Sequence, residues 1–476
     1  MTKAVDIPLD LSKGSIAINT SAGSYTVGGG AATLFDAATD HLVISLSETG
    51  PTVNTIAVTG SVPVSITLSG VNIDVRAVSD ACAFDMTGAT VSLTIAGTNT
   101  LKSGYGRAGL QVPSSATLTI DAASAADSLT SIGGFYGAGI GGGDGSSSAG
   151  GNITLNGGTV NAQGGFQAAG IGGGRSGAGG NITINSGLVN AQGSTYGAGI
   201  GGGHGGSGQN TALNGGTINA QGGFYAAGIG GGANSDVIGN TSDGAGGTIV
   251  ISGGKVSATG GVNDLGVFGI GGGAGIGSSG NCGVTGNITV TGDAAVEAIG
   301  GAGGGAGIGT GGNDGSGWQA GRIVITGKII STGMLTAKEV KAIGSGDYGE
   351  YGQGSAIGFG GVNEGGSNAG EGIPIPYETT VTYHAVTVSA NAGGAITAFP
   401  VSNNPAQIPS GANQTFKIAP NAGYKIVSVT VDDVNVGAAT SWTIPNITDN
   451  TRTIAATFAA AVSDAPTNVN AANSGI

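Results

Sequence analysis

Short runs in which apolar and polar residues alternate recur along much of the chain. Clear examples lie at 41–46, 64–70, 91–97 and 116–120, where every second residue is apolar or glycine. Alternation with a period of two is typical of a β-strand with one buried and one exposed face. No apolar pattern of period 3.6 long enough for an α-helix accompanies these runs. We therefore predict an all-β fold.

A glycine-rich segment repeats at a fixed period in the middle of the chain. Residues 137–143 have the sequence Gly-Ala-Gly-Ile-Gly-Gly-Gly, and close copies lie at 168–174, 197–203 and 226–232. The isoleucines of these copies are 31, 29 and 29 residues apart. A period of this size indicates stacked supersecondary units.

The content of each period predicts which repeat fold it forms. Two or three short strands that point in different directions cannot pair with one another inside a unit. Each strand can pair with the same strand of the next unit, in parallel and about 4.8 Å away. We therefore predict a right-handed parallel β-helix, a solenoid in which one repeat forms one coil, with glycines at the corners.

After residue 232 the period becomes longer and less regular. We expect the corner to recur at Ile270, Ile308 and Ile357. Longer steps with the same strand pattern indicate insertions, which in solenoids map to loops that often carry binding. The segments 233–245, 262–286 and 338–354 are the insertions that we predict.

The pattern divides the chain into five parts. Residues 1–133 are predicted to form an N-terminal cap and irregular first coils, and 134–370 the regular coils with corner insertions. Two prolines in 371–383 mark a linker. Residues 384–460 are predicted to form a small antiparallel β domain, and 461–476 a linker or the start of a truncated domain.

Stacked coils convert repeated residues into columns. Tyr136, Tyr196 and Tyr225 each lie four residues before a corner isoleucine. If this column faces outward, it offers apolar ring faces to a sugar; the alternative, which we favour, is a ladder that holds the coils together. Columns of amides are predicted to be structural, with hydrogen bonds along the rod; they comprise Asn152/Asn181/Asn210, Asn156/Asn185/Asn214, Asn161/Asn190/Asn219 and Gln163/Gln192/Gln221.

Composition and charge exclude several classes of partner. The formal net charge is −13 with only 14 Lys and Arg, and no basic cluster is present to neutralise the phosphates of a nucleic acid. No run of 18 apolar residues indicates a membrane span. The N-terminus lacks the apolar core of a signal peptide, so we expect either a trimmed chain or another route, such as release in a phage particle.

Candidate catalytic residues are few. The densest set of carboxylates is Asp347 and Glu350, interleaved with Tyr348 and Tyr351 on a predicted insertion. Paired carboxylates can serve a polysaccharide-degrading enzyme, but a solvated polar loop is the favoured interpretation. We predict no metal site and no cofactor, because the three histidines lie in separate segments.

Three stretches resemble known protein families, the first two of which occur in bacterial surface proteins. The segment 94–101, followed by the serial glycine corners, looks like a family usually described as carbohydrate-binding, over residues 60–360. Residues 384–459 are similar to the internalin-type B-repeat, with the resemblance carried by 419–426, 429–437 and 454–458. The start of a fibronectin type III domain is similar to 464–469. These resemblances imply an extracellular, modular and non-catalytic protein.

Three functional hypotheses follow. The favoured one is an extracellular or cell-surface scaffold, an adhesin that binds a glycan or a cell-surface receptor. Its site residues would be Tyr136, Tyr196, Tyr225, Asp347, Tyr348, Glu350 and Tyr351. The alternatives are a phage tail fibre or filament component, which would be a trimer, and a polysaccharide lyase or hydrolase.

Overall fold

The computed structural model divides the chain into two compact units, Met1–Thr379 and Thr380–Ile476. Each unit is described by itself. The structure describes residues 5–145, 148–234, 244–262, 271–280, 284, 286–291, 294–301, 305–312, 323–325, 328–329, 339–343, 357–358, 383–399, 406–409, 412–448 and 451–461.

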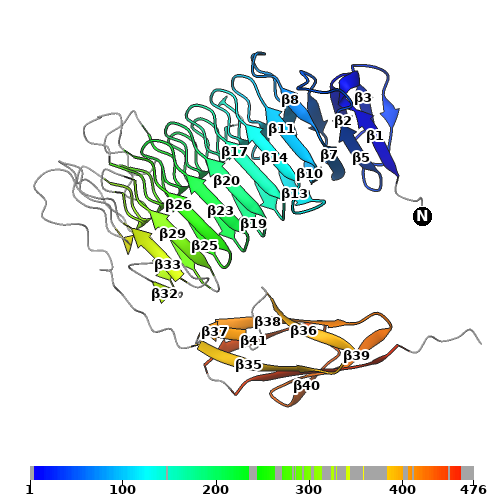
Figure 1. The fold of residues 1–476 in the computed structure, drawn as a ribbon, viewed down its shortest axis with the longest axis vertical. Helices are drawn as coiled ribbons and strands as arrows, with labels where there is room; N and C mark the ends of the chain where they lie inside the picture. Colours follow the sequence, from blue (N-terminus) through cyan, green and yellow to red (C-terminus); the bar gives the residue numbers. More distant parts are fainter. Residues whose placement is uncertain are drawn as a thin grey trace, which may run out of the picture. The chain divides into compact units, whose positions relative to one another are not determined.

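The N-terminal unit is a parallel β-helix, as the sequence predicts. Each regular coil contributes one strand to each of three sheets, and Figure 1 shows these strands stacked coil upon coil. One coil, for example, consists of β16 (Asn152–Leu155), β17 (Thr159–Gln163) and β18 (Ile171–Gly172). We name the sheets that contain them the first, second and third sheet.

Within the described residues, the three sheets have 11, 10 and 13 strands. The first sheet consists of β16 and of β1 (Asp6–Asp10), β5 (His41–Ser45), β7 (Val64–Ser69), β10 (Thr90–Ala96), β13 (Thr117–Ala122), β19 (Asn181–Ile184), β22 (Asn210–Leu213), β25 (Thr248–Ile251), β28 (Asn287–Val290) and β31 (Ile323–Ile325). The second consists of β17 and of β8 (Asn72–Asp74), β11 (Thr98–Lys102), β14 (Ser128–Ile132), β20 (Leu188–Gln192), β23 (Thr217–Gln221), β26 (Lys255–Thr259), β29 (Ala295–Ile299), β32 (Lys328–Ile329) and β33 (Glu339–Ile343). The third consists of β18 and of β2 (Ile16–Asn19), β3 (Ser24–Val27), β4 (Thr33–Leu34), β6 (Ile56–Thr59), β9 (Phe84–Asp85), β12 (Leu110–Gln111), β15 (Ile140–Gly141), β21 (Ile200–Gly201), β24 (Ile229–Gly230), β27 (Ile276–Gly277), β30 (Ile308–Gly309) and β34 (Ile357–Gly358).

The register confirms that like residues stack. Ile140 pairs with Ile171, Ile171 with Ile200, and Ile200 with Ile229. The next partner of Ile229 is Ile276, so the prediction that Ile270 forms this corner is wrong. Both isoleucines stand in a Gly-Ile-Gly context, and only the length of the preceding insertion decides between them.

The core lies between the three sheets, where the apolar residue of each alternating pair points inward. In one coil it is filled by Ile153 and Leu155 from the first sheet, Val160 from the second and Ile171 from the third, all fully buried or nearly so. The residues that alternate with them along the same strands face outward and form the columns discussed below.

Glycine in the third sheet allows the coils to approach closely. Gly172 has φ +131°, and a Cβ built there would lie 2.1 Å from the carbonyl oxygen of Gly201 in the next coil. Equivalent glycines at 141, 201, 230, 277 and 309 share the positive φ. A side chain at these positions would therefore push neighbouring coils apart.

The N-terminal end of the helix is closed by a short antiparallel meander. After the first-sheet strand β1, the chain forms a 3-10 turn at Leu11–Lys13 and then β2, which pairs with β6 of the next coil and, on its other side, antiparallel with β3. β4 pairs antiparallel with β3. This arrangement covers the edge that β2 would otherwise expose.

The predicted insertions 233–245 and 338–354 are largely outside the described residues, whereas 262–286 contains the third-sheet strand β27, so that range is not an insertion throughout. Where the structure describes them, the segment 338–354 contains β33, which pairs with β29 in the second sheet. The start of this segment is therefore a strand and not a loop, contrary to the prediction.

The C-terminal unit is a small β domain of two sheets. The five-stranded sheet contains β35 (Tyr383–Ala390), β37 (Ala406–Pro409), β39 (Tyr424–Val431), β40 (Val434–Gly437) and β42 (Thr453–Ala460). The three-stranded sheet contains β36 (Gly394–Phe399), β38 (Ala412–Pro420) and β41 (Ser441–Ile447). Most pairs are antiparallel, but β35 and β42 are parallel, which the prediction of an antiparallel domain missed.

Candidate functional site

The structure places the three tyrosines of the predicted column, Tyr136, Tyr196 and Tyr225, in different environments. Tyr225 is fully buried, and Tyr136 and Tyr196 are half-buried. Their φ angles are 61°, 76° and 69° in the same order. They lie in turns and not in extended strands, so the strand alternation that suggested their direction does not apply. The alternative of an outward column that offers its rings to a sugar, which included Tyr225 as a candidate site residue, therefore does not hold at Tyr225.

Tyr196 and Tyr225 instead pack corners of successive coils together. Their rings are stacked, with centroids 5.8 Å apart and planes inclined by 13°. Tyr225 also belongs to a small buried apolar cluster with Ala226 and Ala233. This packing favours the structural interpretation of the column.

A different aromatic column is exposed at the same corner. We name Tyr105, Phe135 and Phe166 the corner strip; they are 48%, 46% and 36% exposed. Their ring centroids are 5.6 and 4.8 Å apart, and the planes are nearly parallel. Both faces of Phe135 are therefore turned toward a neighbouring ring, which leaves mainly ring edges to the solvent. The strip is an apolar ridge and does not offer free ring faces along its length.

The spacing of the corner strip is visible in the sequence. Each member lies five residues before the apolar residue of the corner, which is Leu110, Ile140 or Ile171. What the sequence could not show is that this position, and not the next one, points outward from the turn.

The predicted asparagine columns form hydrogen-bonded ladders. In each ladder the side-chain Nδ2 of one coil donates to the Oδ1 of the preceding coil at 2.7–2.9 Å. The prediction of amide ladders along the rod is confirmed for the asparagines; the bonded residues are Asn152/Asn181/Asn210, Asn156/Asn185/Asn214 and Asn161/Asn190/Asn219.

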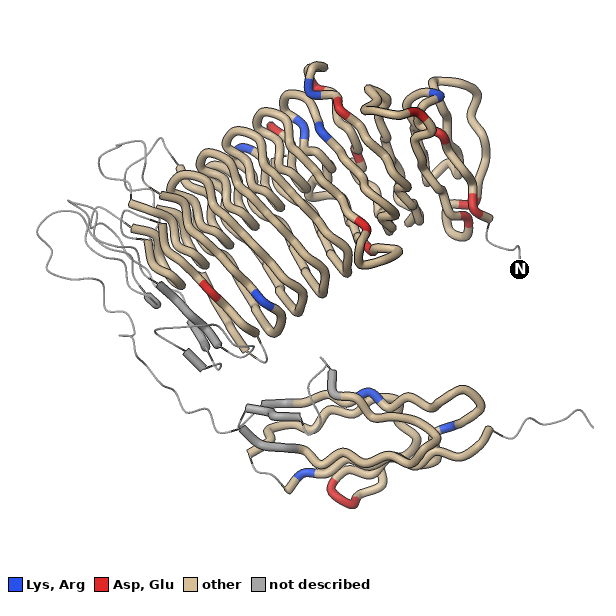
Figure 2. Tube along the Cα trace, in the orientation of Figure 1, with Lys and Arg blue, Asp and Glu red and all other residues tan. Residues whose placement is uncertain are grey.

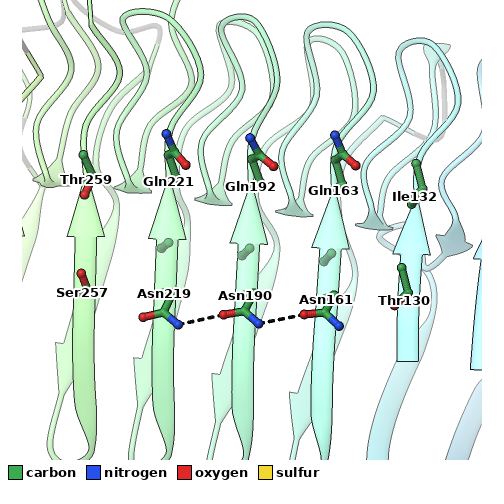
Figure 3. A pocket seen from close by; sticks show the side chains of 13 residues that line it. Thr130, Ile132, Asn161, Gln163, Asn190, Gln192, Asn219, Gln221, Ser257 and Thr259 are labelled. Atoms are coloured by element: carbon green, nitrogen blue, oxygen red, sulfur yellow. Dashed lines mark hydrogen bonds between the residues drawn. The ribbon is translucent and has the colours of Figure 1, made fainter. Parts of the chain in front are cut away.

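The glutamine column differs from the asparagine columns beside it. Gln163, Gln192 and Gln221 are exposed at the ends of β17, β20 and β23, and they pair in register. Figure 3 shows their amides side by side and pointing the same way, with hydrogen bonds drawn between the asparagines and none between the glutamines. Among the residues that the structure describes, these three amides make no hydrogen bond with the protein. The prediction of a structural ladder does not hold for this column.

The glutamines and asparagines line an open groove on the outer face of the second sheet. Its volume is about 510 Å³. All of its lining residues are uncharged; they are Thr130, Ile132, Asn161, Ala162, Gln163, Asn190, Ala191, Gln192, Asn219, Ala220, Gln221, Ser257 and Thr259. Each of the three glutamine coils therefore presents one asparagine and one glutamine to the groove.

The groove is bounded along the rod by a change of residue type. On one side Gln163 pairs with Ile132, which pairs with Lys102. On the other side Gln221 pairs with Thr259, which pairs with Ile299. The polar stretch thus ends at an isoleucine on both sides.

Charge is scarce around the groove. Between residues 145 and 234 the only Asp, Glu, Lys or Arg is Arg175, and Figure 2 shows the middle coils almost free of charged positions. Arg175 lies over the ring of Tyr136, with its Cζ 4.4 Å from the ring centroid, a cation–π contact at the corner. The groove consequently offers dipoles and not charges to a ligand.

The predicted acidic site cannot be placed. Asp347, Tyr348, Glu350 and Tyr351 lie outside the described residues. Within the described part of the chain, no group of three His, Cys, Asp or Glu side chains could hold a metal ion. No helix in that part is long and apolar enough to cross a membrane.

Stacked coils of one repeated unit, with side chains in columns along the rod, define the class of this chain: it is a β-helical repeat protein. A family model described as the beta helix repeat matches residues 153–175, 182–204 and 213–233. These matches fall on the three consecutive coils that carry the asparagine ladders and the glutamine column. No curated protein and no solved structure matches the chain.

Proposed function

We propose that this chain is a non-catalytic extracellular or cell-surface scaffold, and that the groove of the second sheet binds carbohydrate. The observation that carries this proposal is the column of exposed glutamine amides without partners in the protein. A primary amide offers both a donor and an acceptor, as a sugar hydroxyl does. Three such groups in register can therefore pair with the hydroxyls of a glycan.

The surrounding structure supports recognition by keeping the groove in shape. The asparagine ladder fixes the side chains beside the glutamines, and the parallel strands fix the distance between coils at about 4.8 Å. Binding groups on rigid strands lose less conformational freedom than groups on loops when a ligand binds. Only the glutamine side chains must become ordered.

The chemistry of the groove favours binding over catalysis. Glycoside hydrolysis requires carboxyl groups on both sides of the scissile bond, and the groove is lined by amides, hydroxyls and alkyl groups. The C-terminal unit, with its resemblance to the internalin-type B-repeat, fits a spacer in a modular surface protein. We expect incubation with polysaccharides to release no new reducing ends.

A glycan array probed with the full chain tests the proposal. We expect binding to one or more glycans, and its loss when Gln163, Gln192 and Gln221 are all replaced by alanine. The matched control replaces Asn152, Asn181 and Asn210, which are three exposed amides of the same coils on the first sheet. Absence of binding to all glycans, or equal loss in both variants with intact folds, would contradict the proposal.

A further inference from the structure

The groove repeats identical chemistry in one direction only. Along the rod, Asn161, Asn190 and Asn219 lie in one column, and Gln163, Gln192 and Gln221 lie in the next. Along a single strand the outward positions carry different residue types: in β17 they are Thr159, Asn161 and Gln163. The adjoining column is also broken, since Leu188 lies between Thr159 and Thr217.

A repeated array at constant spacing matches a ligand that repeats at the same spacing. Neighbouring parallel strands are about 4.8 Å apart, which is close to the length of one sugar ring in an extended polysaccharide. In a β-1,4-linked chain parallel to the rod, each coil would meet one ring, and successive rings are rotated about the chain axis. An amide both donates and accepts a hydrogen bond, so it can pair with the hydroxyls of a ring in either orientation. A chain that crosses the strands would meet different groups at each step.

The register sets the length of the array. Pairs of polar outward residues occur on four consecutive coils: Asn161/Gln163, Asn190/Gln192, Asn219/Gln221 and Ser257/Thr259. The column then ends at Ile132 and Ile299, and Glu297 follows Ser257 in the other column. The lining residues are uncharged, so none of them can compensate an acidic sugar; the nearest outward cation on these strands is Lys255, two residues before Ser257 on β26.

We infer that the groove binds a linear, uncharged polysaccharide whose chain runs parallel to the rod, with one sugar ring for each of four coils. This inference rests on the proposed function and adds to it the ligand class, the direction of the chain and the number of subsites. In a branched glycan, the branch would leave the line of the asparagine and glutamine columns. It would lie over residues of other types, so a branched glycan should bind less tightly.

A length series of oligosaccharides tests the inference by calorimetry on the full chain. The probes are cello-, manno-, xylo- and chito-oligosaccharides from disaccharide to octasaccharide. For the series that binds, each ring up to the tetrasaccharide should strengthen binding roughly three- to tenfold, as expected for one or two hydrogen bonds. Longer chains should gain little more.

A variant of the fourth coil makes the test specific. Ser257→Ala with Thr259→Ala should remove the gain from the fourth ring, so that affinity levels off at the trisaccharide. Thr248→Ala, an exposed residue of the same coil on the first sheet, should leave the length dependence unchanged.

The outcomes separate the inference from the function on which it rests. Binding that does not depend on chain length, or a plateau that stays at the tetrasaccharide in the fourth-coil variant, would overturn the inference and leave a glycan-binding groove in place. Preference for acidic or branched glycans on the array would also overturn it alone. Absence of binding to every oligosaccharide and every array glycan would overturn both.

Discussion

The close approach of coils in the third sheet predicts a large effect for Gly172→Ala. A Cβ at this position would meet the carbonyl oxygen of Gly201 at 2.1 Å, and the same oxygen accepts a hydrogen bond from the backbone N–H of Gly173 at 2.9 Å. Relief of the clash must lengthen or break that bond. The loss of a buried hydrogen bond costs about 1–3 kcal/mol, overpacking about 1–3 kcal/mol, and the positive φ adds about 1 kcal/mol.

We therefore expect Gly172→Ala to lower the free energy of unfolding by about 3–7 kcal/mol. Gly157→Ala is the matched control, because its Cβ would find its nearest atom at 3.8 Å and its φ is not positive. That control should change stability by no more than about 1 kcal/mol in either direction.

Denaturant unfolding followed by circular dichroism measures the difference between these two variants. Solenoids can open locally, since each coil contacts only its neighbours. Hydrogen exchange at β18 and β21 should therefore accompany the unfolding curve, and protection should fall there first in Gly172→Ala. Equal stability of the two variants would refute the close stacking of these corners.

Three further predictions concern the packing, the ladder and the acid response. Tyr225→Ala should cost about 3 kcal/mol because it removes a fully buried ring, whereas Phe135→Ala should cost about 1 kcal/mol or less; equal denaturant midpoints would contradict the burial. Asn190→Ala should cost about 1–3 kcal/mol because it breaks two ladder bonds, and Gln192→Ala should cost about 0.5 kcal/mol or less; the reverse order would contradict the assignment of the two columns. The pKa of Asp74 is lowered from 3.8 to about 2, mainly by hydrogen bonds from a neighbouring arginine, so its contribution to stability is present above pH 3.8 and is lost as the pH falls toward about 2. The thermal midpoint of Asp74→Asn should lie below that of the wild type at pH 5 and approach it at about pH 2; a constant gap would contradict this role.

The architecture could be predicted because it repeats. A spacing of 29 residues between like segments leaves few ways to bury the isoleucines other than stacking the coils. The corner at Ile276 was missed because a variable insertion precedes it, and a pattern of Gly-Ile-Gly alone does not give its register.

The direction of side chains at the corners could not be predicted. Alternation holds in extended strands, and it correctly places Ile153 and Leu155 in the core. It does not decide which of the two adjacent aromatic columns faces outward at the corner, where a positive φ at Tyr136 and Tyr225 turns the chain. Turn conformation depends on local geometry that a glycine-rich sequence leaves undetermined.

The amide columns show how far the candidate site itself could be predicted from the sequence. The sequence identifies both asparagine and glutamine columns, yet only the asparagines bond along the rod. A glutamine side chain is one methylene longer and extends farther from the sheet, so its amide is available to a ligand. This difference in reach becomes visible only in the folded coil.

The central claim is that three glutamines, each 29 residues from the next, form one binding site. The side-chain amide resonances of isotope-labelled glutamine, assigned with single Gln→Ala variants, test it directly during titration with the glycan that binds. The account predicts that the signals of Gln163, Gln192 and Gln221 shift together with one Kd, while that of Gln209 stays in place. Unchanged signals of the three glutamines while the protein binds the glycan would contradict it.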